Sequence, residues 1–415
     1  MRVLLVGSGG REHALAWKLA ASPMLTKLWA APGNPGIGQH AECVPIGATD
    51  IPRLVAFARE RRIDLVVPGP EAPLVAGLAD AVGEAGILCC GPTASAARIE
   101  GSKAFAKEIC DAAGVPTARW ERFDTVDEAQ EFIRRRGAPI VVKADGLASG
   151  KGVVVAATVE EAEAAAQGLL VPGGALLVEE CLQGREASLF ALCDGRHAVF
   201  LGAARDHKRV GDGDTGPNTG GMGAVSPVPG FHPDHAMDGV IRPVLAELAR
   251  RGTPFRGVLF AGLMLMQDGV SLIEFNARFG DPECQALMPL LRSDLLPALV
   301  AACEGELADF ALHWRSEASC AVVIAARGYP GEAMRGGVIQ GVEAAEAVPG
   351  ALVFQAGTRE VGGALMAEGG RVLTLVGTAP TPERAREIAY RAVSAVDWPG
   401  GFCRTDIGAG DIELG

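Results

Sequence analysis

The first hundred residues alternate short apolar runs with longer amphipathic runs, and each apolar run ends at glycine or proline. The clearest apolar runs are Arg2–Val6, Lys27–Ala31 and Asp64–Val67. Strands that alternate with helices in this way form a mainly parallel sheet with helices on both faces. We therefore predict an open parallel α/β sheet in the N-terminal part of the chain.

The loops after these strands, 7–11, 32–34 and 69–71, are expected to share one crevice, because ligands of such sheets bind beyond the carboxyl ends of the strands. An NAD site is disfavoured, since Glu12 stands where the third glycine of the dinucleotide fingerprint belongs. The helix N-terminus beside Arg11 suits a single phosphate, and a tight turn without a ligand is the alternative. The candidate residues for a substrate phosphate and ribose are Gly9, Gly10, Arg11, Gly33, Asn34, Pro70 and Glu71.

Length and composition exclude several classes of protein. A chain of 415 residues exceeds what one hydrophobic core supports, so we expect about two to four domains. No apolar run approaches the ~18 residues of a membrane span, and the apolar run at the N-terminus is too short for a signal peptide. The net charge of −12 disfavours nucleic acid as a partner. We expect a cytoplasmic protein that binds small molecules.

Lysine is rare, with 7 of the 38 basic residues. A sequence rich in arginine is expected to keep lysine where a compact ammonium matters, as around polyphosphate, although codon bias also explains the count. Lys143 and Lys151 flank the glycine-rich loop 144–152, between the predicted strands Pro139–Lys143 and Val153–Ala156. The loop lacks Walker A spacing. A strand–loop–strand cover over phosphates and a solvated hairpin both fit this pattern.

A second domain is predicted to begin near residue 102, with a helix from Ser102 to Ala113. Further along, the predicted strand 175–179 runs into a hinge that suits adenine, and Glu186 follows as a candidate for ribose hydroxyls. Acids at strand ends are more often simply solvated. The glycine-rich segment 206–223 is too long for a plain connection, so we expect an active-site loop there.

The segment 257–283 predicts a metal site at the end of a β-hairpin. Val258–Met266 and Val270–Phe275 form the two strands, joined by a good turn sequence. Glu274 and Asn276 are two positions apart and so project from the same face. Two oxygen ligands suit magnesium, which completes its shell with water and substrate phosphates. Arg278 then offers a fork for a carboxylate or phosphate, and a polar hairpin end is the alternative.

After Asp309 the sequence predicts a small α+β domain. Strands are expected at Ala321–Ala325 and Arg371–Gly377, followed by a helix from Pro382 to Val396. We find no chemistry in the sequence of this domain.

Four segments together resemble one known family. They are 7–13 (GSGGREH), 206–212 (DHKRVGD), 216–223 (GPNTGGMG) and 278–285 (RFGDPECQ). These runs are similar to those of the glycinamide ribonucleotide synthetase family, which belongs to the ATP-grasp superfamily. The resemblance implies an N-terminal α/β domain over 1–101, an ATP-grasp domain over 102–313 with a mobile lid at about 120–187, and a C-terminal domain over 314–415.

The resemblance also implies roles for individual residues. It places adenine at the hinge, ribose at Glu186, phosphates on lysines and Mg²⁺ or Mn²⁺ on the hairpin end. The implied ATP-binding residues are Lys103, Lys143, Lys151, Glu179, Glu180, Leu182 and Glu186; the implied metal ligands are Glu274 and Asn276; the implied catalytic residues are Asp206, Lys208, Arg278 and Asp281. A monomer is expected.

The activity implied by the resemblance is ATP-dependent ligation of glycine to 5-phosphoribosylamine through glycyl phosphate, in de novo purine biosynthesis. A sister ligase with another acid or amine, a nicotinamide oxidoreductase and a non-catalytic nucleotide sensor are the alternatives. Because catalysis of this kind depends on positioning and electrostatics, we expect Glu274→Ala and Arg278→Ala to abolish turnover while the fold stays intact.

Overall fold

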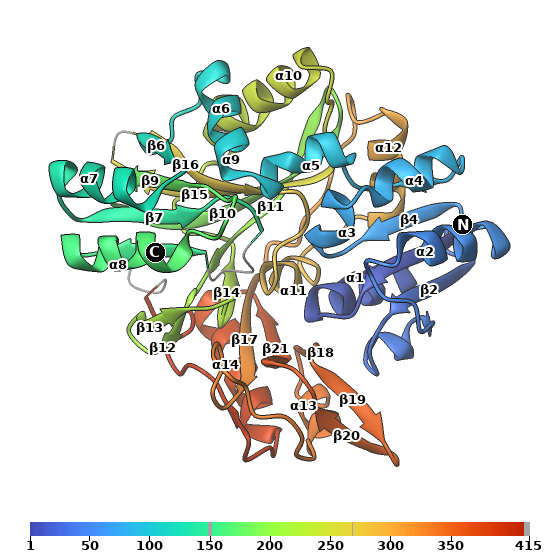
Figure 1. Ribbon diagram of the computed structural model, residues 1–415. Coiled ribbons are helices and arrows are strands. Elements are labelled where there is room, and N and C mark those ends of the chain that lie inside the picture. The colour runs from blue at the N-terminus through green and yellow to red at the C-terminus, as the bar shows by residue number, and fades with distance from the viewer. Residues whose placement is uncertain (148–151, 268, 411–415) are drawn as a thin grey trace.

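The computed structural model describes residues 1–147, 152–267 and 269–410. Figure 1 shows an N-terminal part in blue, a central part from cyan to yellow that carries an outlying lobe, and a C-terminal part in orange and red. None of the helices within the described ranges combines the length and the apolarity that a membrane crossing requires.

The N-terminal part is a five-stranded parallel sheet in the order β3-β2-β1-β4-β5, as predicted. Its strands are β1 (Arg2–Gly7), β2 (Lys27–Pro32), β3 (Glu42–Cys43), β4 (Leu65–Pro68) and β5 (Leu88–Cys89). Its helices are α1 (Gly10–Ala20), α2 (Ile51–Glu60), α3 (Glu71–Val75), α4 (Leu78–Glu84) and α5 (Ala94–Gly101), with a 3-10 turn, η1, at Ile37–Gln39. The predicted strands agree with these bounds to within one residue at each end.

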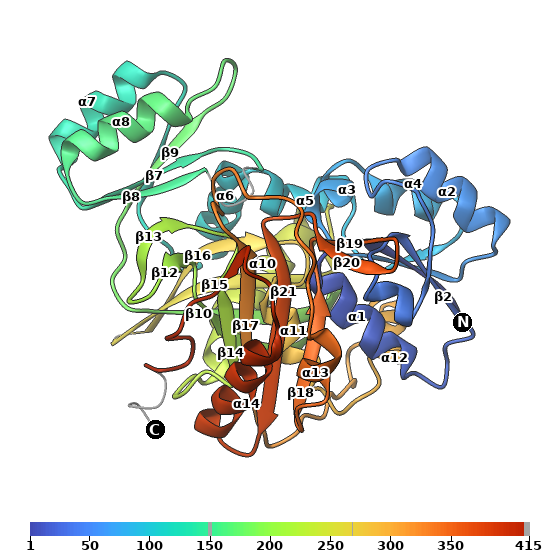
Figure 2. The same ribbon diagram turned by 90° about the horizontal axis from the view of Figure 1, so that it is seen from below.

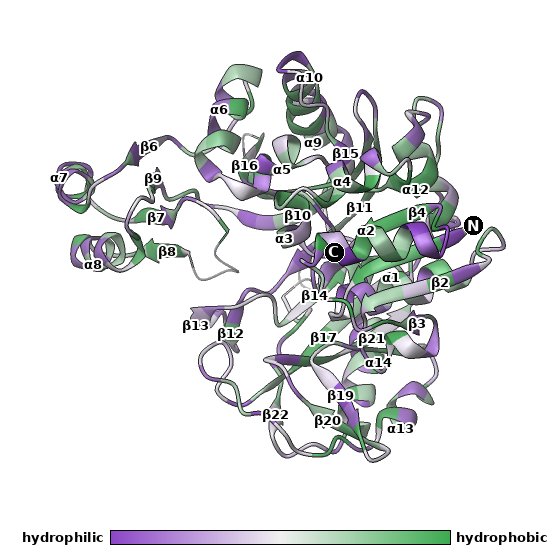
Figure 3. Cartoon of the chain, turned by 45° about the vertical axis from the view of Figure 1, so that its right-hand side comes forward, coloured by the Kyte–Doolittle hydropathy of each residue, from purple (hydrophilic) through white to green (hydrophobic). Residues whose placement is uncertain are grey.

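The strand order reverses between β1 and β4, which places the ligand crevice beyond Gly7 and Pro68. Gly7 has a φ of +130°, and a Cβ there would lie 2.6 Å from Cγ of Glu12. Only glycine therefore allows β1 to turn directly into α1. Figure 3 shows the strands of this sheet mainly in hydrophobic green.

The outlying lobe is a four-stranded antiparallel sheet in the order β6-β9-β7-β8, with two helices. Its elements are β6 (Trp120–Phe123), α7 (Val126–Arg136), β7 (Ile140–Ala144), β8 (Val153–Ala156), α8 (Val159–Leu169) and β9 (Leu176–Glu180). The strands expected on both sides of the loop 144–152 are present. The lobe has its own apolar cluster, which includes Ile133, Val142 and Leu176, and it projects from the body in both ribbon views (Figures 1 and 2). Its mobility as a lid stays a prediction.

The rest of the central part carries the long strands of the molecule. Its elements are α6 (Lys103–Ala113), β10 (Arg185–Asp194), β11 (Ala198–Asp206), β12 (Arg209–Gly211), β13 (Thr215–Asn218), β14 (Gly223–Ser226), α9 (Pro233–Ala236), the π-helix η2 (Met237–Ile241), α10 (Arg242–Arg250), β15 (Arg256–Met266), β16 (Gly269–Asn276), α11 (Glu283–Leu287) and α12 (Leu295–Glu304). The predicted hairpin is β15–β16. The segment predicted as a loop, 206–223, contains the small hairpin β12–β13, which is purple and hydrophilic in Figure 3.

The C-terminal part continues the central sheet rather than starting a new one. Its elements are β17 (Ala318–Ala326), α13 (Val342–Glu346), β18 (Ala351–Gln355), β19 (Thr358–Val361), β20 (Ala364–Ala367), β21 (Arg371–Ala379), α14 (Pro382–Ala395) and β22 (Gly401–Phe402). β14 pairs with β17, so one sheet runs β16-β15-β10-β11-β14-β17-β21-β18. A single apolar cluster that includes Leu15, Phe190, Leu287 and Val376 joins all three parts.

His13 on α1 ties the N-terminal part to the C-terminal part. Its Nδ1 accepts a hydrogen bond of 2.7 Å from the backbone N–H of Gln355, and its ring packs nearly perpendicular to the ring of Phe354, at a centroid distance of 5.4 Å and an angle of 83°. Burial, reinforced by the neighbouring His40, lowers the pKa of His13 to about 3. The imidazole is therefore neutral at pH 7 in the folded protein.

This low pKa predicts a pH-dependent stability. Below the unfolded pKa of 6.5 the unfolded chain binds a proton at His13 that the folded chain does not, so stability falls as the pH falls from 6.5 toward 3. We expect His13→Asn to show a smaller drop in Tm between pH 7.5 and pH 5 than the wild type. Thermal unfolding at both pH values measures this, with the exposed His232→Asn as a control that should follow the wild type. An equal drop in all three proteins would contradict the prediction.

Candidate active site

A cleft of about 830 Å³ lies where the N-terminal part, the lobe, the central sheet and the C-terminal part meet. Most of the candidate residues line it, although they come from widely separated segments. The candidates at the cleft are Arg11, Pro70, Glu71, Lys103, Lys143, Glu179, Glu180, Leu182, Glu186, Asp206, Lys208, Glu274, Asn276, Arg278 and Asp281. Gly9, Gly10, Gly33 and Asn34 do not line it, and Lys151 lies outside the described residues.

Glu179, at the end of β9, is buried between two lysines. Its Oε2 lies 2.9 Å from Nζ of Lys143 and 3.0 Å from Nζ of Lys107. Lys107 also donates to Oγ1 of Thr117 at 2.7 Å. In the sequence, Lys107 was notable only because lysine is rare. Its place in the cleft follows from the ion pair between Lys107 on α6 and Glu179 on β9. The Glu179 side chain thus sets the lysines in place, beside a hinge backbone that continues to Leu182.

Lys103, at the start of α6, faces the glycine-rich loop of the lobe. Its Nζ donates to the carbonyl of Gly146 at 2.8 Å. Burial lowers the pKa of Lys103, an effect that Glu274 partly opposes. Lys103 and Lys143 therefore bring two ammonium groups to one wall of the cleft, as a polyphosphate requires.

Glu274 and Asn276 on β16 both line the cleft, as their spacing predicts. Burial alone would raise the pKa of Glu274, but Lys208, Lys143 and Lys103 together hold it below its usual range. The group is an ionised carboxylate among cations. One carboxylate and one amide oxygen on the same face fit a magnesium ion that takes its other ligands from water and phosphates. No cluster of three or more His, Cys, Asp or Glu suited to a metal occurs among the described residues.

Lys208 lies between carboxylates of two neighbouring strands, β10 and β11, that border the cleft. Its Nζ lies 3.0 Å from Oε2 of Glu186 and 4.0 Å from Oδ2 of Asp206. Burial raises the pKa of Asp206 to about 7, although Lys208 counteracts this and Glu283 adds to it. Glu283 is itself buried and accepts a hydrogen bond of 3.2 Å from Ser188. An acid that titrates near neutral pH and a cation therefore lie side by side.

Arg278 joins the central part to the N-terminal part. Its Nε lies 3.0 Å from Oε2 of Glu71, and its second terminal nitrogen lies 3.0 Å from Oε1 of Glu100. Glu100 also accepts the backbone N–H of Ala277 at 2.7 Å. Sequence reasoning missed Glu100, which offered no signal inside its helix. Since Arg278 neutralises two carboxylates, its removal should affect the fold as well as catalysis.

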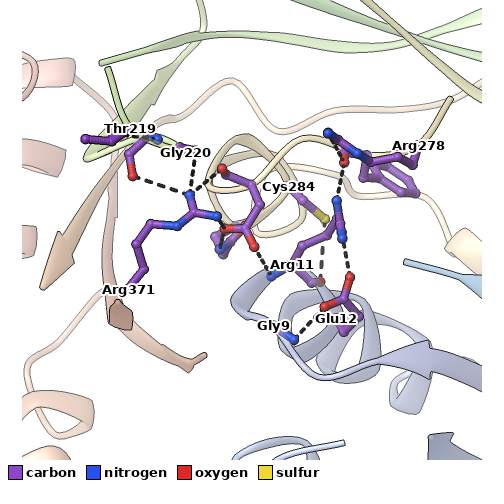
Figure 4. A network of polar contacts seen from close by, with 12 residues as sticks. Gly9, Arg11, Glu12, Thr219, Gly220, Arg278, Cys284 and Arg371 are labelled. Atoms are coloured by element: carbon purple, nitrogen blue, oxygen red, sulfur yellow. Dashed lines mark hydrogen bonds and ion pairs between the residues drawn. The ribbon is translucent and has the colours of Figure 1, made fainter. Parts of the chain in front are cut away.

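The N-terminus of α1 is already capped by protein carboxylates. The N–H of Gly9 donates to Glu12 at 2.5 Å, and the N–H of Arg11 donates to Asp281 at 3.4 Å. The Arg11 side chain pairs with Glu12 at 2.6 Å and donates to the carbonyl of Phe279 at 3.0 Å, as Figure 4 shows. A phosphate at this helix end would have to compete with two internal anions.

The remaining N-terminal candidates shape the loops behind the cleft. Asn34 donates from its amide to the carbonyl of Ser8 at 2.8 Å and to that of Gln355 at 2.9 Å. A Cβ on Gly33 would lie 2.3 Å from Sγ of Cys43, and one on Gly10 would lie 2.5 Å from Nε2 of Gln285. These residues permit close packing of the loops.

The C-terminal part contributes Arg371 to the cleft wall. No chemistry was expected in this part from its sequence. The guanidinium donates to the carbonyls of Gly220 and Asp281, each at 2.6 Å. Arg371 opens the predicted strand 371–377, and nothing in the local sequence distinguishes it from other surface arginines.

The sequence matches models of one known protein family along most of its length. Models of the phosphoribosylglycinamide synthetase N domain, ATP-grasp (A) domain and C domain match residues 1–100, 101–284 and 319–410. The chain belongs to the phosphoribosylglycinamide synthetase family. A phosphoribosylamine–glycine ligase of Mesorhizobium japonicum is 54% identical over 98% of both chains. The crystal structure of the Thermotoga maritima phosphoribosylamine–glycine ligase is 33% identical, with a TM-score of 0.85 over 98% of this chain and 100% of that chain.

The predicted ATP-grasp fold of the central part is thereby confirmed, as is the resemblance read from the four sequence segments. Biotin carboxylase of Campylobacter jejuni shares the fold at 16% identity, with a TM-score of 0.72 over 96% of this chain and 92% of that chain. This chain therefore shares its fold with a carboxylase of quite different sequence.

The two ion pairs of Arg278 predict a loss of stability that the sequence analysis did not expect. Arg278→Met leaves Glu71 and Glu100 without their cation, which should lower the free energy of unfolding by about 3 kcal/mol. Adding Glu100→Gln should recover part of this loss, because it removes one uncompensated buried charge. Denaturant unfolding of the wild type, the single variant and the double variant measures both effects. A single variant as stable as the wild type would contradict the prediction.

Proposed function

We propose that this chain joins glycine to 5-phosphoribosylamine at the expense of ATP, giving glycinamide ribonucleotide, ADP and phosphate. The main structural support is that three groups of residues line a single cleft. They are the lysines Lys103 and Lys143, the candidate metal ligands, and the residues at the edge of the N-terminal sheet. A nucleotide, a small amino acid and a phosphorylated sugar amine therefore fit side by side. The full-length similarity to phosphoribosylamine–glycine ligases supports this choice of substrates.

The lobe side of the cleft is the proposed ATP site. The hinge that includes Glu180 and Leu182 would hold adenine by its edges, and Glu186 would accept the ribose hydroxyls. Lys103, Lys143 and Lys151 would neutralise the phosphates. Glu186 pairs with Lys208 at 3.0 Å, so ribose binding would compete for this carboxylate and free the ammonium of Lys208 for the reacting groups.

Glu274 and Asn276 would hold Mg²⁺ or Mn²⁺ at the inner end of that site. A divalent ion bound there neutralises charge on the phosphates of ATP. The cations around Glu274 keep it ionised, so the carboxylate is ready to bind a metal at neutral pH. The structures of biotin carboxylases that share this fold include one with ADP and magnesium, which is consistent with the choice of metal.

The reaction then needs no protein nucleophile. A carboxylate oxygen of glycine attacks the γ-phosphorus of ATP, the bond to the β–γ bridging oxygen breaks, and ADP leaves. The amine of phosphoribosylamine attacks the acyl carbon, loses a proton and displaces phosphate. Lys208 and Arg278 would stabilise the negative charge that spreads over the phosphoryl oxygens. Asp206, with its pKa near 7, is the proposed acceptor of the proton, and Asp281 would hold the turn that carries Arg278.

The N-terminal edge of the cleft is the proposed site of phosphoribosylamine. Arg11, Pro70 and Glu71 line the cleft there and would contact the sugar and its phosphate. Gly9, Gly10, Gly33 and Asn34 would act behind them by shaping the loops.

We also propose domain bounds of 1–101, 102–313 and 314–415, a lid at about 120–187, a monomeric state and a cytoplasmic location.

The proposed function is tested by measuring ADP release with ATP, glycine and freshly generated phosphoribosylamine, leaving out each in turn. We expect ADP release only when all three are present. Release with another amino acid or another amine in place of these two would point to a sister ligase. ATP binding without turnover under every condition would point to a nucleotide sensor.

Removal of the metal ligand predicts a specific kinetic loss. Glu274→Gln keeps the size of the side chain and removes the charge that would hold the divalent ion. We expect kcat to fall by about a hundredfold or more, with a higher magnesium concentration needed for half-maximal activity. Titration of magnesium against initial rate measures both, and Glu304→Gln on the distant helix α12 is the matched control. Unchanged magnesium dependence would contradict the assignment.

A further inference from the structure

Gly220, in the segment 219–222 between β13 and β14, is held from both sides by the C-terminal part. Its N–H donates to the hydroxyl of Tyr329 at 2.9 Å, and its carbonyl accepts from Arg371 at 2.6 Å. Figure 4 shows the guanidinium of Arg371 pointing at Thr219 and Gly220. A Cβ on Gly220 would lie 3.1 Å from Cζ of Arg371 and 3.3 Å from the hydroxyl of Tyr329. We call these contacts of Tyr329 and Arg371 with the backbone of Gly220 the Gly220 clamp. They suit a residue that has no side chain.

Arg371 uses the same guanidinium to fix the turn that carries Arg278. It donates to the carbonyl of Asp281 at 2.6 Å and lies 3.5 Å from the carboxylate of that residue. It also reaches the carbonyl of Gly221 at 3.3 Å. The rigid planar fork of arginine is suited to holding several acceptors in a fixed arrangement. One side chain of β21 thus fixes two segments of the central part.

The clamped segment in turn supports the backbone of Lys208. The N–H and the hydroxyl of Thr219 donate to the carbonyl of Lys208 at 2.7 Å and 2.8 Å. The N–H of Met222 donates to the carbonyl of His207 at 2.8 Å, and the N–H of His207 donates to the carbonyl of Gly223 at 2.9 Å. A shift of the segment at Gly220 would therefore move the Lys208 backbone.

We propose that Tyr329 and Arg371 are positioning residues, which place the Lys208 ammonium in the cleft by clamping Gly220. This inference rests on the proposed role of Lys208 in the reaction. The Nζ of Lys208 lies between Glu186 and Asp206, and Lys208 lines the same cleft as the candidate metal ligand Glu274. Misplacement of a catalytic group by about 1 Å can cost roughly a hundredfold in rate. The C-terminal part is then a component of the catalytic machinery without touching the reacting atoms.

The hydroxyl of Tyr329 can be removed without changing how its ring packs, which isolates the hydrogen bond to Gly220. The ring packs on Gly370, where a Cβ would lie 2.5 Å from Cδ2 of the ring. Tyr329→Phe keeps this packing and removes only the oxygen that accepts from Gly220. The chain has two tyrosines, and the other supplies the matched control. The hydroxyl of Tyr390 donates to the carbonyl of Arg404 at 2.9 Å and accepts from the N–H of Ile407 at 3.0 Å, in the same part of the molecule but outside the cleft wall.

The experiment compares steady-state kinetics of the full-length wild type, Tyr329→Phe, Arg371→Lys and Tyr390→Phe. We expect kcat to fall about tenfold to a hundredfold in the first two variants, with a smaller change in the KM for ATP, which reflects the pairing of Lys208 with Glu186. Tyr390→Phe should lower Tm and leave kcat at the wild-type value. Wild-type kcat in Tyr329→Phe would overturn the inference, and the active wild type in the same assay would show that the proposed function still holds.

A double-variant cycle separates positioning through Lys208 from a general structural effect. In a Lys208→Arg background, which keeps the positive charge but not the geometry, Tyr329→Phe should cause little further loss of kcat. An undiminished loss in that background would show that the two residues act independently and would overturn the inference. Failure of the wild type itself to release ADP in the presence of all three substrates would instead refute the proposed function.

Discussion

The cleft depends on the neutralisation of carboxylates that the fold takes out of water. Glu179 and Glu100 are almost fully buried, and a buried charge without a partner costs several kcal/mol. Each receives cations from a distant segment: Glu179 from α6 and β7, and Glu100 from Arg278 after β16. Because the partners are far apart in sequence, the chain reaches this charge balance only when the lobe, the central sheet and the N-terminal part have assembled. The same cations then face the cleft.

The three parts share one apolar cluster, and the central and C-terminal parts also share one sheet. The sheet passes from the central part to the C-terminal part through β14 and β17, and the largest apolar cluster includes residues of all three parts. The lobe is the exception, since its apolar cluster is its own. The wall made by β16, β11 and β21 therefore belongs to the parts that are joined by the shared sheet, whereas the wall made by the lobe rests on a separate apolar cluster. Such a division suits an enzyme that must fix reacting groups on one side and admit nucleotide on the other.

Sequence patterns predicted the features that depend on local periodicity. Alternation along β16 placed Glu274 and Asn276 on one face, and the bounds predicted for β1, β2 and β4 were correct to within a residue at each end, whereas the two-residue strands β3 and β5 were not predicted. Glu12 lies three residues after Gly9, which is the spacing of a helix cap, so the internal cap of α1 was partly readable. Asp281, which shares that cap from 270 positions away, was not. Lys107, Glu100 and Arg371 were missed for the same reason, since each acquires its place only through long-range pairing.

The scarcity of lysine takes on a sharper meaning once the partners are known. Lys103, Lys107, Lys143 and Lys208 line the cleft, so four of the six lysines among the described residues lie there. Two of them share the single carboxylate oxygen of Glu179 at 2.9 Å and 3.0 Å, which compact ammonium groups on flexible stems achieve more easily than two planar guanidinium groups. Arginine occurs instead where a fork must hold several acceptors, as at Arg278 and Arg371. Codon bias explains a low number of lysines but not this division between the two kinds of contact, which follows from the shape of each cation.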